Sequence, residues 1–420
     1  MPASPDAMSP VKVPPNLPEL VRTAFNRARA SGDVNFYPTQ VTILNVNSVP
    51  IQLRFSPALA NKPKAPLPPS PTIAPSDAST TNSPEQKPHK KPFFDPFDKP
   101  PAAMLITRLA PSHLLVLNKF AVVPEHFILA TQAFKEQTHL LERADLEVAY
   151  ACIEAYHTHH QHRHQHRHRH YHDNNNNNNN KSQNDAGEDE DDGELFVFFN
   201  SGPHSGASQP HRHIQLLPVA RMREGLEEVE GGGAWEVLAA GLAAAGAGTG
   251  AEDGGPLPLR GRVPFQTFAE RIGPGADLRR VYLRLYRRAC EAVLGAAEGG
   301  AAAEVPADGG GGGDGEDGKE GVEARISYNL AMTRDVMVVM PRLAEGEVVS
   351  VVERDGTRRV VGKLALNGTV LAGTALVKSQ AEWDALRVEP EQLLEILGRI
   401  GVPSVQAPPP LDGVGRLVML

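Results

Sequence analysis

The chain has 420 residues, of which 40% are hydrophobic, which is enough for one large domain or two ordinary ones and excludes a wholly disordered protein. The formal net charge of −8 comes from two acidic tracts, Lys181–Asp192 and Glu304–Glu320, each with six acidic residues and one lysine, so the remainder carries about +2. A body so close to neutral gives no electrostatic case for binding nucleic acid, which requires lysine and arginine to neutralise phosphates.

Cysteine content and hydropathy indicate the compartment. Cys152 and Cys290 are too few for a disulfide framework, which suits a reducing environment. No run of about 18 apolar residues is present, so we expect no membrane-spanning helix. The amino-terminal sequence MPASPDAMSPVKVPP lacks the cationic start and apolar stretch of a secretory signal. We therefore expect a cytoplasmic protein, with the nucleus as the alternative, that contacts no membrane.

Four segments show neither helix nor strand periodicity, and we expect them to be extended loops or disordered inserts. They are a proline-rich stretch at about 61–91, a histidine-, asparagine- and acid-rich stretch at 157–193, a glycine- and alanine-rich stretch at 231–255, and a similar acidic stretch at 296–320. The histidine tract could bind divalent metal opportunistically, but its composition is more typical of a repeat-expanded loop.

Strand and helix patterns alternate between these segments. Strands are predicted over 104–109, 114–117, 127–130, 195–199 and 214–219, and helices over 144–156, 278–293 and 391–397. Residues 326–332 and 336–340 read as a hairpin, and Asn367-Gly368 predicts a second hairpin between 363–366 and 369–377. This mixed order of hairpins and helices favours an α+β fold over a parallel doubly wound sheet.

A glycine- and serine-rich loop follows the buried strand at 195–199. Gly202 and Gly206 permit backbone conformations closed to other residues, so that successive amide groups can converge on an anion. Ser205, Ser208 and Gln209 add neutral hydrogen-bond donors. The loop therefore predicts a phosphate-type binding site.

His211, His213 and Gln215 follow the loop at a spacing of two. On a strand this spacing places all three side chains on one face, while Arg212 and Ile214 point away. A neutral imidazole is nucleophilic near pH 7 and can form a phosphoramidate, with His213 best placed to attack and His211 to support it. The Gln215 amide can donate to a phosphoryl oxygen but supplies no proton, which suits a leaving group such as a polyphosphate.

These residues resemble a known family. HxHxQ after NSGxxSGASQ is similar to the histidine-triad superfamily, in the transferase branch that ends in glutamine, and specifically to the diadenosine tetraphosphate phosphorylases, or ATP adenylyltransferases. The likeness extends to His113–His126, which resembles LLNKFPVxPEH with Ala121 at a usual proline. It continues, in order, through Ser327–Asp335, Pro341-Arg342, Leu371–Gly373 and Leu397–Pro403.

The resemblance implies an α+β, HIT-like antiparallel sheet with flanking helices. It implies a catalytic region at 15–220 with inserts at about 61–91 and 157–193, a low-complexity linker at 221–258, and an ATP adenylyltransferase-type region at 259–420 with an insert at about 296–320. Such enzymes cleave diadenosine tetraphosphate with inorganic phosphate to ATP and ADP, and catalyse the reverse. Nucleotides and phosphate are the expected partners, and a divalent cation, Mg²⁺, is expected to arrive with the nucleotide. Nothing in the residues fixes an oligomeric state.

By matching positions, the resemblance assigns roles to individual residues. His213 would be the nucleophile that attacks the α-phosphorus, supported by His211, with Gln215 binding the transferred group. Substrate-binding positions would be Lys62 (or Lys64), Asn118, Lys119, Asn200, Gly206, Ala207, Ser208, Gln209, Asn329, Thr333 and Met337. No residue is assigned to a resident metal.

Other interpretations of the same residues remain open on sequence grounds. The His211/His213 pair could chelate zinc, although no nearby cysteine or well-placed carboxylate completes a tetrahedral set. A uridylyl transfer between sugar phosphates uses the same HxHxQ string. A non-catalytic nucleotide sensor could use the loop to hold a ligand without turnover. Some of the proposed substrate-binding residues are also of types that are common in ordinary turns, namely Asn118, Lys119, Asn329 and Thr333.

Overall fold

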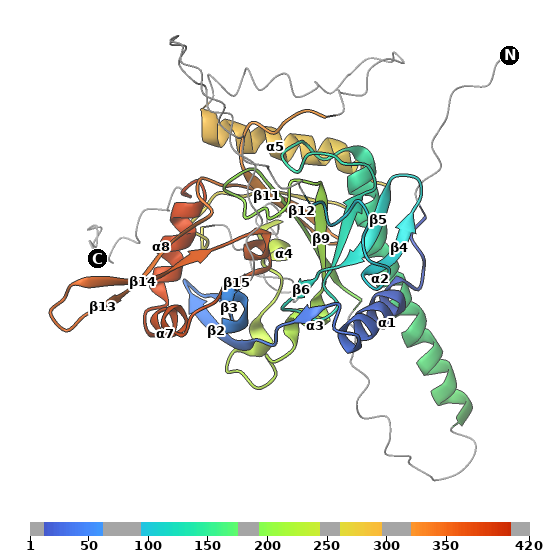
Figure 1. Ribbon diagram of the computed structural model, residues 1–420, viewed down its shortest axis with the longest axis horizontal. Helices are drawn as coiled ribbons and strands as arrows, with labels where there is room; N and C mark the ends of the chain where they lie inside the picture. The colour runs from blue at the N-terminus through green and yellow to red at the C-terminus, as the bar shows by residue number, and fades with distance from the viewer. Residues whose placement is uncertain (1–11, 62–93, 175–192, 244–260, 296–320, 405–420) are drawn as a thin grey trace, which may run out of the picture.

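An eight-stranded antiparallel sheet forms the centre of the protein (Figure 1). The computed structural model describes residues 12–61, 94–174, 193–243, 261–295 and 321–404. The strand order is β10-β12-β11-β8-β9-β7-β5-β4. The strands are β4 (Leu105–Leu109), β5 (His113–Leu117), β7 (Phe127–Thr131), β8 (Leu195–Ser201), β9 (His213–Pro218), β10 (Phe268–Arg271), β11 (Tyr328–Met332) and β12 (Val336–Pro341). Both the amino-terminal and the carboxy-terminal sequence regions therefore contribute strands to one sheet.

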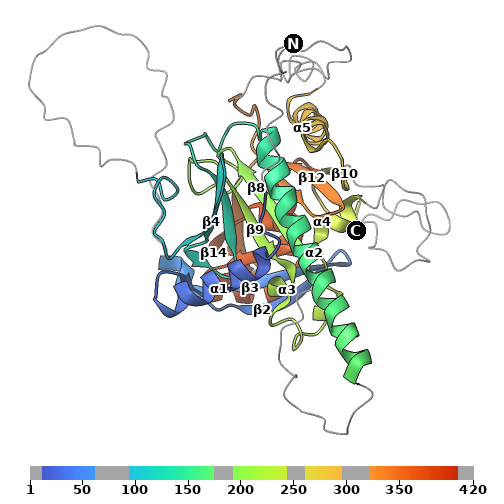
Figure 2. The same ribbon diagram turned by 90° about the vertical axis from the view of Figure 1, so that its right-hand side faces the viewer.

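Three helices cover one face of this sheet. They are α1 (Leu17–Ala30), α2 (Arg143–Asn174), which Figure 2 shows crossing the strands, and α5 (Leu278–Leu294). Alternation along the strands decides which side chains meet these helices: Val197 and Phe199 of β8 and Leu216 of β9 point into this core. The strand at 195–199 is apolar throughout because both of its faces are covered.

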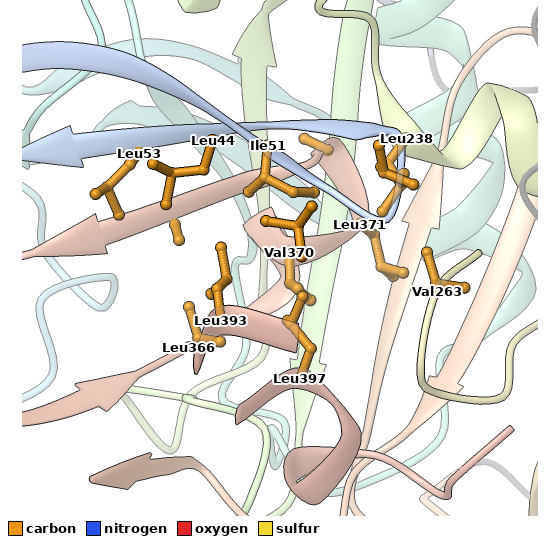
Figure 3. Close-up of a cluster of buried hydrophobic side chains, with 14 of the residues drawn as sticks. Leu44, Ile51, Leu53, Leu238, Val263, Leu366, Val370, Leu371, Leu393 and Leu397 are labelled. Atoms are coloured by element: carbon orange, nitrogen blue, oxygen red, sulfur yellow. The ribbon is translucent and has the colours of Figure 1, made fainter. Parts of the chain in front are cut away.

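The opposite face packs against a second, smaller layer. A three-stranded sheet, β15-β3-β2, is built from β2 (Gln40–Val46), β3 (Val49–Phe55) and β15 (Thr374–Val377). It is joined by α4 (Leu238–Ala243), the 3-10 helix η5 (Gly368–Ala372), α7 (Gln380–Val388) and α8 (Glu391–Ile400). Figure 3 shows leucine and valine side chains from β2, β3, α4, η5 and α8 converging in this core. Because β3 pairs in parallel with β15, the two ends of the described chain are tied together here.

Shorter elements complete the described chain. They are β1 (Asn35–Phe36), which pairs with β6 (Phe120–Ala121), η1 (Pro57–Asn61), α3 (Val219–Arg223), η2 (Gly232–Ala234), and the hairpin of β13 (Gly346–Val352) and β14 (Arg358–Ala365). The β13–β14 hairpin projects from the body in Figure 1. No helix in the described ranges has the length and apolar character needed to cross a bilayer.

The α+β expectation is confirmed, and so are the hairpin of β11 with β12 and the antiparallel run of β4, β5 and β7. Periodicity reasoning missed several elements, among them α1, β2, β3, β10, β13, α4 and α7. Helix α1 has buried residues at Leu17, Val21, Ala24 and Ala28, a helical spacing that would have revealed it.

Three expectations are wrong in the described residues. Helix α2 continues to Asn174, so residues 157–174 are not a loop; histidine, arginine and glutamine extend a helix once it has started, and no glycine or proline interrupts this stretch. Asn367-Gly368 makes no hairpin: β14 pairs with β13, and Asn367 Oδ1 accepts from the Thr369 amide (3.0 Å) at the start of η5.

The third wrong expectation concerns the 221–258 linker. Its described part, through residue 243, is packed rather than loose. Trp235 is 2% exposed and donates from Nε1 to the Gly373 carbonyl oxygen (3.1 Å), and Leu238 is buried in the adjacent core. Composition misled here because alanine and glycine can line a helix that buries only a few larger side chains.

The core between the two layers gives a stability prediction. Leu371 of η5 is fully buried within it, so Leu371→Ala should lower the free energy of unfolding by about 2–5 kcal/mol. The measurement is the midpoint of urea denaturation. Val360→Ala, at a valine that is 58% exposed on β14, is the matched control and should change stability by less than about 0.5 kcal/mol. Equal effects of the two variants would contradict this packing.

Candidate active site

His213 lies at the first residue of β9, on the sheet face opposite α2 and α5. Its ring Nδ1 lies 2.8 Å from the backbone carbonyl oxygen of His211. A carbonyl oxygen can only accept, so Nδ1 carries the proton and Nε2 keeps the lone pair. The side chain is buried, and the Phe97 ring lies 5.4 Å from the imidazole. In its neutral form the imidazole is therefore held in the tautomer that can attack through Nε2.

Gln137 fixes the backbone of His213. The His213 amide donates to Gln137 Oε1 (2.7 Å), while Gln137 Nε2 donates to the carbonyl oxygens of Asn200 (2.8 Å) and His213 (3.2 Å). Paired residues of β8 and β9 end at Phe198 and Gln215, so the strands separate beyond this point. The buried Gln137 amide occupies that opening and replaces the missing ladder bonds. Sequence reasoning missed it because no local pattern marks it.

His211 is clamped from both sides and is 1% exposed. Its Nδ1 lies 2.6 Å from Asp95 Oδ2, and its Nε2 lies 2.9 Å from the Thr131 carbonyl oxygen and 3.0 Å from the Thr131 hydroxyl. The rings of Phe97 and Phe134 lie 5.4 and 5.2 Å away. Since both ring nitrogens are occupied, His211 supports His213 through its backbone carbonyl and has no nitrogen to offer zinc.

Asp95 and Phe97 come from a loop that sequence reasoning did not single out. Asp95 Oδ1 also accepts from the Phe97 amide (2.9 Å), which shapes the turn that places Phe97 over the two imidazoles. A pocket of about 460 Å³ opens beside this loop and is lined by Phe94, Asp95, Asp98, Lys99, Gln132, Phe134 and His211. The sequence DPF after a proline-rich tract gave no signal of this role.

Two glycines allow the loop after β8 to lie close to neighbouring backbone. Gly202 and Gly206 have φ of +85° and +79°, in the region that favours glycine. A Cβ on Gly202 would lie 2.4 Å from Ser327 Oγ, and one on Gly206 would lie 2.7 Å from Asn367 Cβ. Ser205 is buried and donates to the Gly202 carbonyl oxygen (2.7 Å), so it holds the loop together, whereas Ser208 is exposed and Gln209 half-buried.

A buried polar network joins this loop to the carboxy-terminal region. Asn200 Oδ1 accepts from Asn329 Nδ2 and from the Gly368 amide, both at 2.9 Å, and Asn329 Nδ2 also donates to the Ser205 carbonyl oxygen (2.9 Å). Arg342 donates to Asn329 Oδ1, and burial lowers the pKa of its guanidinium to about 10. Asn200 and Asn329 therefore brace the loop beside His213.

The structure brings some predicted substrate-binding residues to this face and leaves others apart. Gln215 is two residues beyond His213 on β9 and half-buried, and Gly206, Ala207, Ser208 and Gln209 form the adjacent loop. Asn118 Nδ2 lies 3.0 Å from His126 Nδ1, and Lys119 is exposed beside it. In the register of β7 with β9, Ala130 pairs with His213 and Phe127 with Leu216. His126 precedes Phe127, so the Asn118–His126 pair lies about four residues, or about 13 Å, along the strands from His213.

Thr333, Met337 and Lys62 are not part of this arrangement. Asn329 pairs with Asn200 and Met332 with Val197, so Thr333 lies past the far end of that pairing, in the β11–β12 turn. Met337 is fully buried in the core on the opposite face, against α2 and α5. Successive side chains of a strand face opposite sides of the sheet, and the position of Met337 on β12 directs it away from the site. Lys62 lies outside the described residues.

A second buried cluster anchors β9 from behind. Arg212 points away from His213, as its strand position predicts, and donates to Glu142 Oε1 (2.8 Å) and Asp145 Oδ2 (2.9 Å). His113 Nε2 lies 2.9 Å from Asp145 Oδ1. Burial raises the pKa of Asp145, but the hydrogen bond with His113 and the charge of Arg212 outweigh it and hold the pKa below its ordinary value. The strand carrying His213 is thereby tied to the first turn of α2.

One face of β9 therefore carries the His213 imidazole, whose neutral form has its lone pair on Nε2, and the neutral amide of Gln215. The glycine-rich loop lies next to them. No group of three or more histidine, cysteine, aspartate or glutamate residues in the described ranges is placed to hold a metal ion. The arrangement suits nucleophilic attack by nitrogen on an electrophile with anionic oxygens, such as a phosphoryl group.

Comparisons with known proteins identify two family domains in this chain. The Ap4A phosphorylase N-terminal domain matches residues 8–160 and 188–229, and the ATP adenylyltransferase C-terminal domain matches residues 261–403, about four-fifths of the chain together. Protein APA1 of Saccharomyces cerevisiae is 24% identical over 211 residues, 50% of this chain and 51% of that protein. Diadenosine 5',5'''-P1,P4-tetraphosphate phosphorylase 2 of the same yeast is 31% identical over 105 residues, 25% of this chain and 24% of that protein.

The chain thus aligns with about half or less of the length of these curated relatives. The fold likeness is more extensive. The crystal structure of yeast Ap4A phosphorylase Apa2 superimposes with a TM-score of 0.56 at 20% identity, covering 94% of this chain and 97% of that one. From the two domain matches, in order along one chain, we conclude that this protein belongs to the Ap4A phosphorylase family of ATP adenylyltransferases.

Proposed function

We propose that the protein is a nucleotidyltransferase that cleaves diadenosine tetraphosphate with inorganic phosphate to ATP and ADP, and catalyses the reverse reaction. The observation that carries the proposal is the hydrogen bond from His213 Nδ1 to the His211 carbonyl oxygen, which leaves the lone pair on Nε2. One yeast relative is named as a diadenosine tetraphosphate phosphorylase, and solved structures of yeast Apa2 with Ap4A and with AMP share the fold.

The reaction proceeds in two displacements. In the first, His213 Nε2 attacks the α-phosphorus, the bond from that phosphorus to the bridging oxygen breaks, and ATP leaves with the electron pair. In the second, an oxygen of inorganic phosphate attacks the same phosphorus, the phosphorus–nitrogen bond breaks, and ADP leaves while Nε2 regains its lone pair. Splitting the transfer in this way replaces one difficult step by two easier ones.

The remaining residues of the proposed site bind and orient. Gln215 donates from its amide to an oxygen of the transferred phosphoryl group, and backbone amides of the loop at Gly206–Gln209 meet the polyphosphate. Because ATP and ADP depart as stabilised anions, no side chain has to protonate them. Mg²⁺ is proposed to arrive with the nucleotide, held by phosphate oxygens, since it prefers oxygen ligands and neutralises polyphosphate charge.

The proposed nucleophile gives the primary test. His213→Ala should lower the rate of phosphorolysis at least about a thousandfold, because the covalent route is lost, while nucleotide binding changes much less. The assay incubates each protein with diadenosine tetraphosphate, Mg²⁺ and phosphate and separates the products by chromatography. Wild-type turnover in the variant would remove His213 from the mechanism. No products from a folded wild type that binds the nucleotide would favour a sugar-phosphate transferase first and a sensor second.

Asp95 tests the support of the nucleophile. Asp95→Ala removes the acceptor of His211 Nδ1, so the carbonyl that holds the His213 tautomer loses its anchor and kcat should fall about ten- to hundredfold with little change in KM. Asp95→Asn keeps an acceptor oxygen and should recover part of that loss. Asp98→Ala, at an exposed residue of the same loop, is the matched control and should retain wild-type kcat. Equal activity of the Asp95 and Asp98 variants would refute the support role.

Gln215 tests the choice of acceptor. An imidazole at this position can take a proton from water, which an amide cannot do, so Gln215→His should shift the acceptor from phosphate toward water. The expected result is a higher ratio of AMP to ADP among the products at a fixed phosphate concentration. An unchanged ratio would mean that residue 215 does not select the acceptor.

A further inference from the structure

The carboxy-terminal half of α2 carries a dense set of histidines with no part in the proposed reaction. Nine of the sixteen histidines lie between His157 and His172. Figures 1 and 2 show this half of the helix extending beyond the sheet. Because α2 is continuous to Asn174, residues four apart in this tract share one helix face, which a loop would not provide.

His160 and His164 are such a pair, and their rings lie together. The ring centroids are 4.3 Å apart with an interplanar angle of 63°. His160 is half-buried and packs against the backbone before β8, where a Cβ on Gly193 would lie 2.5 Å from His160 Cβ. His164 is exposed. One ring is thus anchored against the body and the other is accessible from solvent.

Neighbouring histidines are engaged differently. His157 Nε2 lies 2.8 Å from the side-chain nitrogen of Gln161. His159 Nε2 lies 3.7 Å from Glu19 Oε1 on α1. His157 and His159 thus face Gln161 and α1, so in the described part of the tract the two histidine rings that contact each other are those of His160 and His164.

We propose that His160 and His164 together bind a divalent transition-metal ion such as Ni²⁺, Cu²⁺ or Zn²⁺. Two imidazole nitrogens from adjacent turns of one helix suit these ions, whereas Mg²⁺ prefers oxygen ligands. No third histidine, cysteine, aspartate or glutamate in the described ranges joins the pair, so water fills the other coordination positions. Asp145, which ties α2 to the strand of His213, is fifteen residues away, or about 22 Å along the helix.

Metal binding at this pair has a consequence for stability. The two rings lie beside each other only when the segment is helical, so the ion binds the folded helix in preference to the unfolded chain. The protein should therefore unfold at a higher temperature in Ni²⁺, by an amount that grows with the concentration of free metal. Mg²⁺ at the same concentration should give no such shift through this site.

The test uses full-length protein without a polyhistidine tag, in a background where the four histidines from 166 to 172 are glutamine. Isothermal titration with NiCl₂ should show one ion per chain. His164→Gln should weaken binding at least about tenfold, because one of two ligands is lost and this exposed side chain can change without disturbing packing. His162→Gln, at an exposed histidine two residues away, is the matched control and should bind as the background does.

Three results would overturn the proposal: a background protein that binds no Ni²⁺, unchanged binding in His164→Gln, or loss of binding in His162→Gln. The last would place the ion on the other side of the helix. None of these results depends on phosphorolysis, so the test is separate from that of the proposed function. Thermal unfolding with and without Ni²⁺, run on the same variants, should follow the same order.

Discussion

A histidine that attacks phosphorus must present an unprotonated nitrogen, and in the proposed mechanism the carbonyl oxygen of His211 decides which nitrogen of His213 that is. The 2.8 Å contact to His213 Nδ1 is useful only if the carbonyl itself cannot move. Asp95 and Thr131 therefore hold His211 from both sides, and Gln137 holds the backbone of His213. In the proposed mechanism His213 therefore does the chemistry, and His211, held at both ring nitrogens, supports it through its backbone carbonyl.

The opening between β8 and β9 is the structural origin of this site. The paired residues of β8 and β9 end at Phe198 and Gln215, so the backbones of Asn200 and His213 no longer pair with each other. The Gln137 amide satisfies these backbone groups, and Asn329 holds the loop beyond β8 through the Asn200 side chain and the Ser205 carbonyl oxygen. Arg342 completes that network from the carboxy-terminal region, which explains how residues far apart in sequence support one loop.

The two faces of β9 differ in the charge of their side chains. Behind the strand, Arg212 is paired with Glu142 and Asp145 in a dry environment, so breaking the cluster would leave a buried charge unpaired. In front of it lie the His213 imidazole and the neutral amide of Gln215, which the proposed function assigns to an anionic substrate. The two environments are separated because successive side chains of β9 face opposite sides of the sheet. The same alternation places Met337 of β12 in the core and Asn329 of β11 beside the loop.

Local sequence determined the α+β class, the hairpin of β11 with β12, and the face shared by His213 and Gln215, because strand alternation and glycine placement are short-range properties. It also indicated the proposed chemistry, since HxHxQ beside a glycine-serine loop offers a candidate nucleophile next to a candidate anion site. It misjudged Asn367-Gly368 because the pairing of β14 with β13 overrode a favourable turn. It misjudged residues 157–174 because a polar tract carries no apolar stripe, although an established helix can extend through it. Tertiary structure alone decided that Asp95 and Gln137 hold the surroundings of His213, the proposed nucleophile, that Arg342 binds Asn329 beside the loop, and that Met337 lies on the opposite face. These contacts join side chains that are far apart in the sequence, and only the packed sheet brings them together.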